Sequence, residues 1–217
     1  MEFDDLVKIM DFYLSDDDGQ KIQLTLSQNE MLRHINESSF TVVYKRRQEG
    51  ISFAISIYIF WSLIKNSGYS IIFLYSSTAE RELFRQMINS NLGKLESFFL
   101  KKGLECKLTP EEHNLNLTKL PNGSTIRYVS KNTQLRGYSA DFIYLSELRN
   151  KDNFIETLAC IFPMIAFSQK AKLVITTSEL RNIKDDFLMN GDFITEYWTN
   201  SFFDGTRKVL LEKTNKN

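Results

Sequence analysis

The sequence has few cysteines and histidines and no net charge. Its two cysteines, Cys106 and Cys160, lie far apart without metal-ligand spacing, which argues against a zinc site or a disulfide scaffold. The two histidines, His34 and His113, have no cysteine or histidine partner at such spacing, so we expect His34 to be structural and His113 to be solvated. Lys+Arg and Asp+Glu number 27 each, so any contact with nucleic acid must come from a local basic patch.

Long hydrophobic runs and targeting signals are also missing. The most apolar window, 51–64, is interrupted by serines and is too short to span a bilayer, so it predicts a buried core helix. The first twenty residues are acidic where a signal peptide needs positive charge followed by an apolar run. Together with the scarcity of cysteine, these absences predict an intracellular protein in a reducing setting, without a membrane partner.

The composition of the sequence and its alternating predicted strands and helices are those of one α/β domain. Its 217 residues are 42% hydrophobic and 25% charged, which is ordinary for a globular protein with a sizeable core. Apolar runs predict buried strands, and between them lie segments with helical spacing. Alternating strands and helices predict a mostly parallel sheet with crossover helices. The predicted strands are 41–44, 69–75, 142–145 and 172–175, and the predicted crossover helices are 52–65 and 79–99.

Other segments predict smaller features around this sheet. Ser27 followed by Glu30 predicts a capping box at the start of a helix. In the helix 79–99, Arg85 is expected on a charged face and Leu83 in the opposite apolar stripe. Short β-like pieces within 105–129, joined by a Pro-Asn-Gly turn at 121–123, predict an antiparallel hairpin at the edge. We also expect a peripheral helix at 1–14, a helix at 192–202 and a strand at 208–211 in the tail.

The loop 45–50, KRRQEG, is the first candidate for a functional site. It joins the strand to the apolar helix that begins near Ser52, and this arrangement places backbone N–H groups and the positive end of a helix dipole around a phosphate. The usual pattern is Gly-Lys-Ser/Thr, where lysine reaches the β- and γ-phosphates and the hydroxyl ligates Mg²⁺. Here Ile51 fills the lysine position, and the basic residues at 45–47 can supply the missing charge. An ordinary strand-to-helix turn with a solvated basic run is the alternative.

Two later strands also end in polar residues. The strand 142–145 ends on Ser146 and Glu147. In nucleotide hydrolases such a strand delivers an acidic pair, of which the first acid holds Mg²⁺ and the second orients the attacking water. Glu147 stands in the water-orienting position, whereas Ser146 replaces the metal-binding acid. The strand from 172 ends in hydroxyl residues at 176–178, which can sense the γ-phosphate, although strands often end in threonine and serine.

Order and spacing of these blocks resemble the ATPase domain of the large terminase subunit of tailed phages, the motor that pumps DNA into capsids. The resemblance rests on Gln28, on Arg47-Gln48-Glu49-Gly50-Ile51-Ser52 at the phosphate loop, on Arg136-Gly137-Tyr138-Ser139-Ala140-Asp141 leading into 142–147, and on Thr176-Thr177-Ser178. It covers about residues 24–198. It implies a P-loop NTPase fold of the RecA-like type, with a parallel central sheet flanked by helices and the small hairpin at its side.

The resemblance also implies a role for each matching residue. Gln28 takes the adenine contact, although by itself it reads as a surface helix residue. Arg47 stabilises the transferring phosphate charge, Lys45 replaces the missing loop lysine, and Glu147 polarises the attacking water. Ser52 and Ser146 lie at the metal, and Thr176, Thr177 and Ser178 couple hydrolysis to DNA movement. The cofactor-binding residues expected for ATP and Mg²⁺ are Gln28, Lys45, Arg46, Arg47, Gln48, Glu49, Gly50, Ile51 and Ser52.

The implied partners are double-stranded DNA, the portal protein and the small terminase subunit, with a possible homo-oligomeric ring on the capsid in the cytoplasm of an infected bacterium. We expect the ATPase domain to span 21–200, preceded by a peripheral segment at 1–20 and followed by a tail at 201–217. No acidic cluster typical of the family's nuclease domain is visible. Since Ile51 and Ser146 remove one charge of each sign from the same cluster, a non-hydrolysing scaffold that binds nucleotide or a partner is the alternative, and a helicase-type fragment is a weaker one.

Overall fold

The computed structural model describes residues 24–45, 49–101, 103, 107–131, 137–149, 154–165, 171–178, 200–204 and 207–209. The helix expected at 1–14 lies outside the described residues, as do residues 46–48 of the loop. The helices are α2 (Leu26–Glu37), α3 (Ile51–Lys65), α4 (Thr78–Lys101) and α5 (Phe154–Ile165). The strands are β1 (Phe40–Tyr44), β2 (Ser70–Tyr75), β3 (Glu112–His113), β4 (Leu117–Lys119), β5 (Thr125–Ser130), β6 (Phe142–Leu145), β7 (Lys172–Thr177), β8 (Asn200–Asp204) and β9 (Arg207–Val209).

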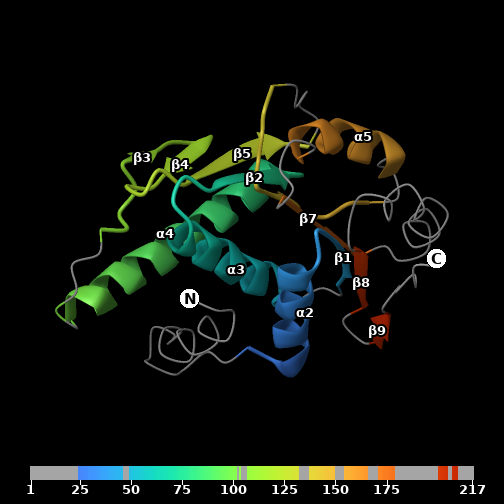
Figure 1. Ribbon diagram of the computed structural model, residues 1–217, viewed down its shortest axis with the longest axis horizontal. Coiled ribbons are helices and arrows are strands. Elements are labelled where there is room, and N and C mark those ends of the chain that lie inside the picture. Colours follow the sequence, from blue (N-terminus) through green and yellow to red (C-terminus); the bar gives the residue numbers. More distant parts are fainter. Residues whose placement is uncertain are drawn as a thin grey trace, which may run out of the picture.

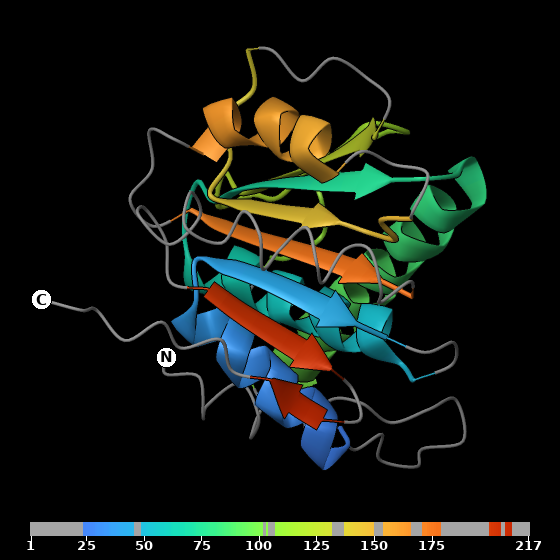
Figure 2. The same ribbon diagram turned by 90° about the vertical axis from the view of Figure 1, so that its right-hand side faces the viewer.

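These strands form one sheet with the order β3-β4-β5-β2-β6-β7-β1-β8-β9. The six strands from β5 to β8 in this order pair in parallel, and β3, β4 and β9 add antiparallel pairs at the two sides. Figure 2 shows the parallel strands running side by side with their carboxyl ends toward the same edge. Ligands bind outside this edge in open α/β sheets. The three strands β6, β7 and β1 are neighbours, so the polar residues that follow them meet there.

Helices cover both faces of the sheet, with α2, α3 and α4 on one face and α5 on the other (Figure 1). Successive residues of a strand point to opposite faces. In β6, accordingly, Phe142 and Tyr144 belong to the core beneath α3 and α4, whereas Ile143 and Leu145 belong to the core beneath α5. Burial on both faces explains why these strands are continuous apolar runs in the sequence.

The predicted fold class and its elements are confirmed at the four parallel strands named from the sequence, at both crossover helices and at the hairpin around 121–123. The predicted capping box at Ser27 is wrong, because Thr25 is the N-cap of α2 and Gln28 its reciprocal partner. The predicted faces of α4 are wrong at two positions, since Leu83 is 63% exposed and Arg85 is 7% exposed.

Two further differences concern the second half of the chain. The prediction of a helix at 192–202 is wrong for residues 200–202, which lie in strand β8 and pair with β1. Residues 192–199 lie outside the described residues. The strand expected at 208–211 overlaps β9. Helix α5 was not among the predicted elements, and none of the described helices is long and apolar enough to cross a membrane.

Candidate nucleotide site

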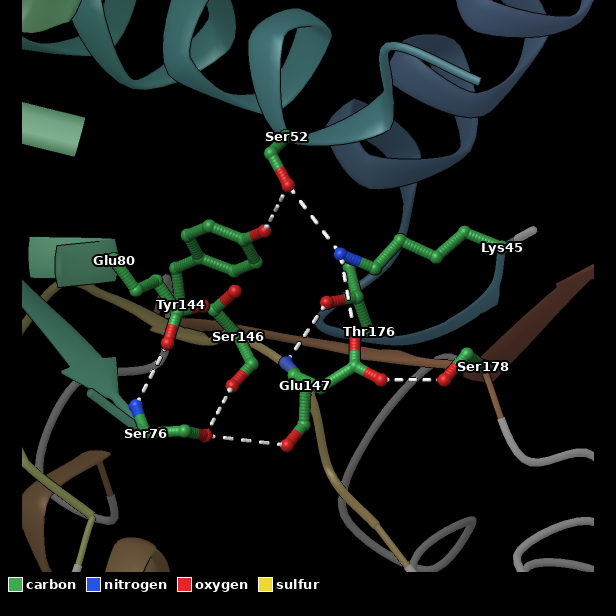
Figure 3. A network of polar contacts seen from close by, with 9 residues as sticks. All are labelled: Lys45, Ser52, Ser76, Glu80, Tyr144, Ser146, Glu147, Thr176 and Ser178. Atoms are coloured by element: carbon green, nitrogen blue, oxygen red, sulfur yellow. Dashed lines mark hydrogen bonds and ion pairs between the residues drawn. The ribbon is translucent and has the colours of Figure 1, made fainter. Parts of the chain in front are cut away.

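Lys45 lies where the ends of β1, β6 and β7 meet. It follows β1 directly, and its backbone N–H donates to the carbonyl of Thr177 at 2.8 Å, which fixes its position beside the end of β7. Its Nζ lies 3.4 Å from the Ser52 hydroxyl and 3.4 Å from Oε2 of Glu147. Figure 3 shows this ammonium group between the start of α3 and the end of β6. One cation therefore contacts both of the elements to which the sequence assigned phosphate chemistry.

The loop reaches α3 through Gly50, which is the N-cap residue with a φ of +66°. This left-handed conformation suits glycine, because a side chain there is strained. The side chain of Gln28 passes directly over Gly50, where an added Cβ would lie 2.7 Å from Gln28 Nε2. Both the backbone angle and the lack of space thus explain the glycine.

Gln28 holds the loop by its backbone. Its Nε2 donates to the carbonyl of Glu49 at 2.9 Å, while its Oε1 accepts the N–H of Thr25 at 2.9 Å. The residue is only 8% exposed, so it is a buried link between α2 and the loop rather than a surface helix residue. Both ends of its amide are engaged by the chain itself, and the adenine contact stays a prediction.

Glu147 is held in an unusual backbone conformation by the end of β7. Its φ is +60°, which for a non-glycine residue costs about 1–2 kcal/mol. The backbone N–H of Glu147 donates to Thr176 Oγ1 at 3.2 Å, and the next N–H, of Leu148, donates to the Thr176 carbonyl at 2.8 Å. The hydroxyl of Ser178 donates to Oε1 of its carboxylate. The hydroxyl residues at the end of β7 and directly after it therefore hold this carboxylate toward Lys45.

The two residues that depart from the usual motifs are both buried. Ile51 and Ser146 are each 3% exposed, and Ile51 belongs to the core beneath α3. The Ser146 carbonyl accepts the hydroxyl of Ser76 at 3.3 Å. The apolar Ile51 thus packs at the start of the helix, and the charge near this position comes from Lys45.

These residues surround a cavity of about 580 Å³, which lies in the range of small-molecule sites. Among the described residues, the charged groups that line it are two cations, Lys45 and Arg149, and three carboxylates, Glu49, Glu80 and Glu147. No group of three histidine, cysteine, aspartate or glutamate side chains in the described parts can hold a metal by itself. The cavity can hold a metal ion together with a phosphate group, because the phosphate supplies further oxygen ligands to the ion. The lining residues are Lys45, Glu49, Gly50, Ile51, Ser52, Phe53, Ser76, Ser77, Glu80, Glu147, Arg149 and Ser178.

Of the eleven predicted site residues that the structure describes, seven line this cavity. Thr176 and Thr177 are fully buried behind it, and Gln28 and Ser146 are near it without lining it. Arg46, Arg47 and Gln48 lie outside the described residues. Sequence reasoning missed Glu80 and Arg149, together with the two serines that follow β2. The sequence contains a signal for these residues, because β2 is also a buried parallel strand and the polar residues that follow it lie at the same edge of the sheet.

A model of the protein family described as the N-terminal part of the T4likevirus-type terminase large subunit matches residues 42–197. The chain belongs to this family. The match covers most of the sequence, from β1 past β7, so the resemblance inferred from the strand ends is confirmed.

Solved structures similar to the terminase chain show the same fold. The large terminase of bacteriophage HK97 superposes with a TM-score of 0.63 and 15% identity, covering 86% of this chain and 41% of that one. The large terminase ATPase domain of Thermus phage P74-26 gives 0.57 and 19%, covering 72% and 67%. The UvsW helicase of bacteriophage T4 gives 0.59 and 11%, covering 93% and 66%. This chain thus spans about two fifths of the HK97 protein, and the helicase shares its architecture.

Proposed function

We propose that this chain is the ATP-binding motor domain of a phage DNA-packaging terminase, which couples ATP hydrolysis to the movement of double-stranded DNA into a capsid. Membership in the terminase family supports the packaging role. The observation that carries the proposal is the position of Lys45 Nζ, within 3.4 Å of both Ser52 and Glu147 at the edge of a 580 Å³ cavity. A lysine from the beginning of the loop thereby compensates for Ile51.

Lys45 offers a cation to a triphosphate, and the three carboxylates of the lining suit the Mg²⁺ that accompanies it. Lys45 is paired with Glu147 here, and a bound nucleotide offers its ammonium group a stronger partner in the β- and γ-phosphates. Glu147 is then free to orient the attacking water and accept its proton. Arg47 is assigned the stabilisation of charge on the transferring phosphate, and Gln28 the contact with adenine.

The donor set also fits Mg²⁺, because Ser52 offers a hydroxyl oxygen and the nearby acids offer carboxylate oxygens. When bound with the nucleotide, the ion supplies neutralisation of the phosphate charge. In this proposal Ser52 is the protein ligand at the start of α3, and the Ser146 position belongs to the same cluster.

The end of β7 is suited to coupling, since its residues contact both sides of the cavity. Thr177 accepts the backbone N–H of Lys45, Thr176 accepts that of Glu147, and Ser178 contacts the Glu147 carboxylate. A change in the Lys45–Glu147 pair therefore reaches a single strand end. We assign these three residues the transmission of hydrolysis to DNA movement. The proposed partners are the portal protein and the small terminase subunit, with assembly as a ring on the capsid in the cytoplasm of the infected bacterium.

The test is ATP turnover by the purified chain and two single variants. We expect Lys45→Ala and Glu147→Ala each to lower the rate by about 10²-fold or more, because each removes a charged group from the transition state. Lys119→Ala and Glu111→Ala are matched controls, since these residues form an exposed ion pair at 3.7 Å in the hairpin, outside the cavity lining. Equal rates for wild type, Lys45→Ala and Glu147→Ala would remove the enzyme claim.

A binding measurement separates the motor from a scaffold that binds a partner and no nucleotide. Calorimetric titration with a non-hydrolysable ATP analogue should show binding that Lys45→Ala weakens. Absence of binding at millimolar nucleotide would favour the scaffold and refute the proposed nucleotide site.

A further inference from the structure

We propose that Glu80 supplies the carboxylate that Ser146 lacks at the metal–phosphate cluster. The assignment rests on the proposed function, since it concerns the same cavity, and it adds a group from a strand end to which the family motifs assign no acid. Glu80 lies in the first turn of α4, five residues beyond the end of β2, and lines the cavity together with Lys45 and Glu147.

The topology brings Glu80 to the place where the missing acid would stand. Strands β2 and β6 are parallel neighbours with Leu74 opposite Leu145, so the residues that follow them emerge side by side. Ser76 connects the two directly. Its backbone N–H donates to Glu80 Oε2 at 2.8 Å, and its hydroxyl lies 3.3 Å from the Ser146 carbonyl (Figure 3).

One carboxylate oxygen of Glu80, Oε1, is available to a metal ion. Ser76 fixes Oε2, and no donor or cation within the described residues contacts Oε1. Glu147 differs, because Ser178 occupies its Oε1 and Lys45 its Oε2. Of these two carboxylates at the strand ends, Glu80 is thus both oriented and open on one side.

The negative charge of Glu80 is the charge that a Mg²⁺ ion at this site requires. Mg²⁺ in phosphoryl-transfer sites is held by one or two carboxylates together with phosphates and waters. The end of β6 offers the neutral, buried Ser146 instead. Glu80 is half-buried at the same wall of the cavity, and it can hold the ion directly or through one of its waters.

A purely structural role for Glu80 makes a different prediction. Its backbone N–H donates to Ser77 Oγ at 3.2 Å while its carboxylate accepts from Ser76, which resembles a capping box at the start of α4. Glutamine can accept the same hydrogen bond without the negative charge. Glu80→Gln therefore keeps the cap and removes the proposed metal ligand, whereas Glu80→Ala removes both.

The experiment measures metal binding rather than turnover. The protein is loaded with a non-hydrolysable ATP analogue and titrated with Mn²⁺, and the free Mn²⁺ is followed by electron paramagnetic resonance. We expect Glu80→Gln to weaken Mn²⁺ binding by about tenfold or more, and not to weaken the affinity for the analogue in EDTA, because the lost carboxylate repels the phosphates when no metal is present. Glu111→Gln, which removes an exposed carboxylate outside the cavity lining, should bind Mn²⁺ like wild type. Adding Ser146→Asp to Glu80→Gln should restore the affinity.

Three results would overturn the proposal. In the first, Glu80→Gln binds Mn²⁺ as wild type does while Glu80→Ala unfolds at a lower temperature, which leaves Glu80 as a helix cap only. In the second, wild type binds the analogue equally well with and without Mg²⁺, which leaves the nucleotide site standing and removes the metal role. In the third, wild type binds no analogue at millimolar concentration, and the proposed function falls together with this inference.

Discussion

At the scale of single residues, Gly50 is a position where the loop tolerates little change. A side chain there meets a left-handed backbone angle of +66° and the amide of Gln28 at 2.7 Å. We predict that Gly50→Ala costs about 1–2 kcal/mol of stability through backbone strain. It should also displace Gln28 from the carbonyl of Glu49 and weaken nucleotide binding. Chemical denaturation and calorimetric titration measure the two effects separately.

Gly68 provides the matched control. Its φ of +69° gives the same backbone penalty, yet nothing lies within 4 Å of an added Cβ. Gly68→Ala should therefore lose a similar amount of stability and keep the wild-type nucleotide affinity. If Gly50→Ala and Gly68→Ala bind nucleotide equally well, the Gln28 contact does not shape the loop.

At the scale of elements, His113 joins the hairpin of β3 and β4 to helix α4. Its Nε2 lies 2.8 Å from Arg85 Nη2 and 2.7 Å from Asn89 Nδ2, and its Nδ1 lies 2.9 Å from Thr118 Oγ1. A guanidinium can only donate, so Nε2 is the acceptor, and the ring is neutral with its proton on Nδ1. His113 is exposed, as expected for a solvated histidine, but the contacts with α4 were not predicted, because Arg85 is 28 residues away in the chain.

This arrangement predicts a pH dependence of stability. Desolvation, followed by the charge of Arg85, lowers the pKa of His113 from its usual 6.5, while Glu82 opposes the shift. Below pH 6.5 the unfolded chain therefore binds a proton more readily than the folded one. The His113 contribution to the free energy of unfolding should decrease as the pH falls from about 6.5 toward the lowered pKa, and then level off. Urea denaturation between pH 7.5 and pH 5 measures it.

His113→Gln is the control for this dependence, because the variant has no group that titrates at this position. Its free energy of unfolding should change less over the same pH range than that of wild type. An identical pH profile for the two proteins would contradict the assignment of this slope to His113.

The same scale explains which elements the sequence could predict. Apolar runs and helical spacing are local signals, and they located the parallel strands and the crossover helices. The cap of α2 was ambiguous, because Ser27-Glu30 and Thr25-Gln28 both fit a capping box. The structure has the Thr25-Gln28 box, in which Gln28 also contacts the carbonyl of Glu49, 21 residues away in the sequence. The burial of Arg85 also depends on a contact between distant parts of the chain. Its partner Glu82 lies on the same helix, but its partner His113 lies in β3.

For the candidate site, the polar ends of β1, β6 and β7 were readable because each motif follows an apolar run. The conformation of Glu147 and the Lys45–Glu147 pair were not, since they depend on how β7 lies between β6 and β1. Glu80 lies in the first turn of α4, where no sequence motif marks it as part of a site. A candidate residue on an element without a known motif can be recognised only once the fold is known.

At the scale of the whole molecule, β1 lies within the sheet because β8 covers its outer side. The two strands pair in parallel from Phe40 opposite Asn200 to Tyr44 opposite Asp204, and β9 continues the sheet beyond them. The strand that leads into the proposed phosphate loop therefore depends on residues near the end of the sequence. Residues 201–204 belong structurally to the sheet, although the sequence favoured a separate tail from 201.

Removing residues 200–217 should consequently destabilise the proposed nucleotide site along with the fold. The deletion leaves one side of β1 unpaired, which costs about 1 kcal/mol for each lost backbone hydrogen bond and exposes an edge that favours aggregation. We expect a lower free energy of unfolding and weaker binding of the ATP analogue. Deletion of residues 210–217 alone retains both β8 and β9 and should behave like the full chain in denaturation and calorimetry. If the longer deletion matches the shorter one in both measurements, pairing with β8 does not support β1, and the loop is held from the β7 side alone.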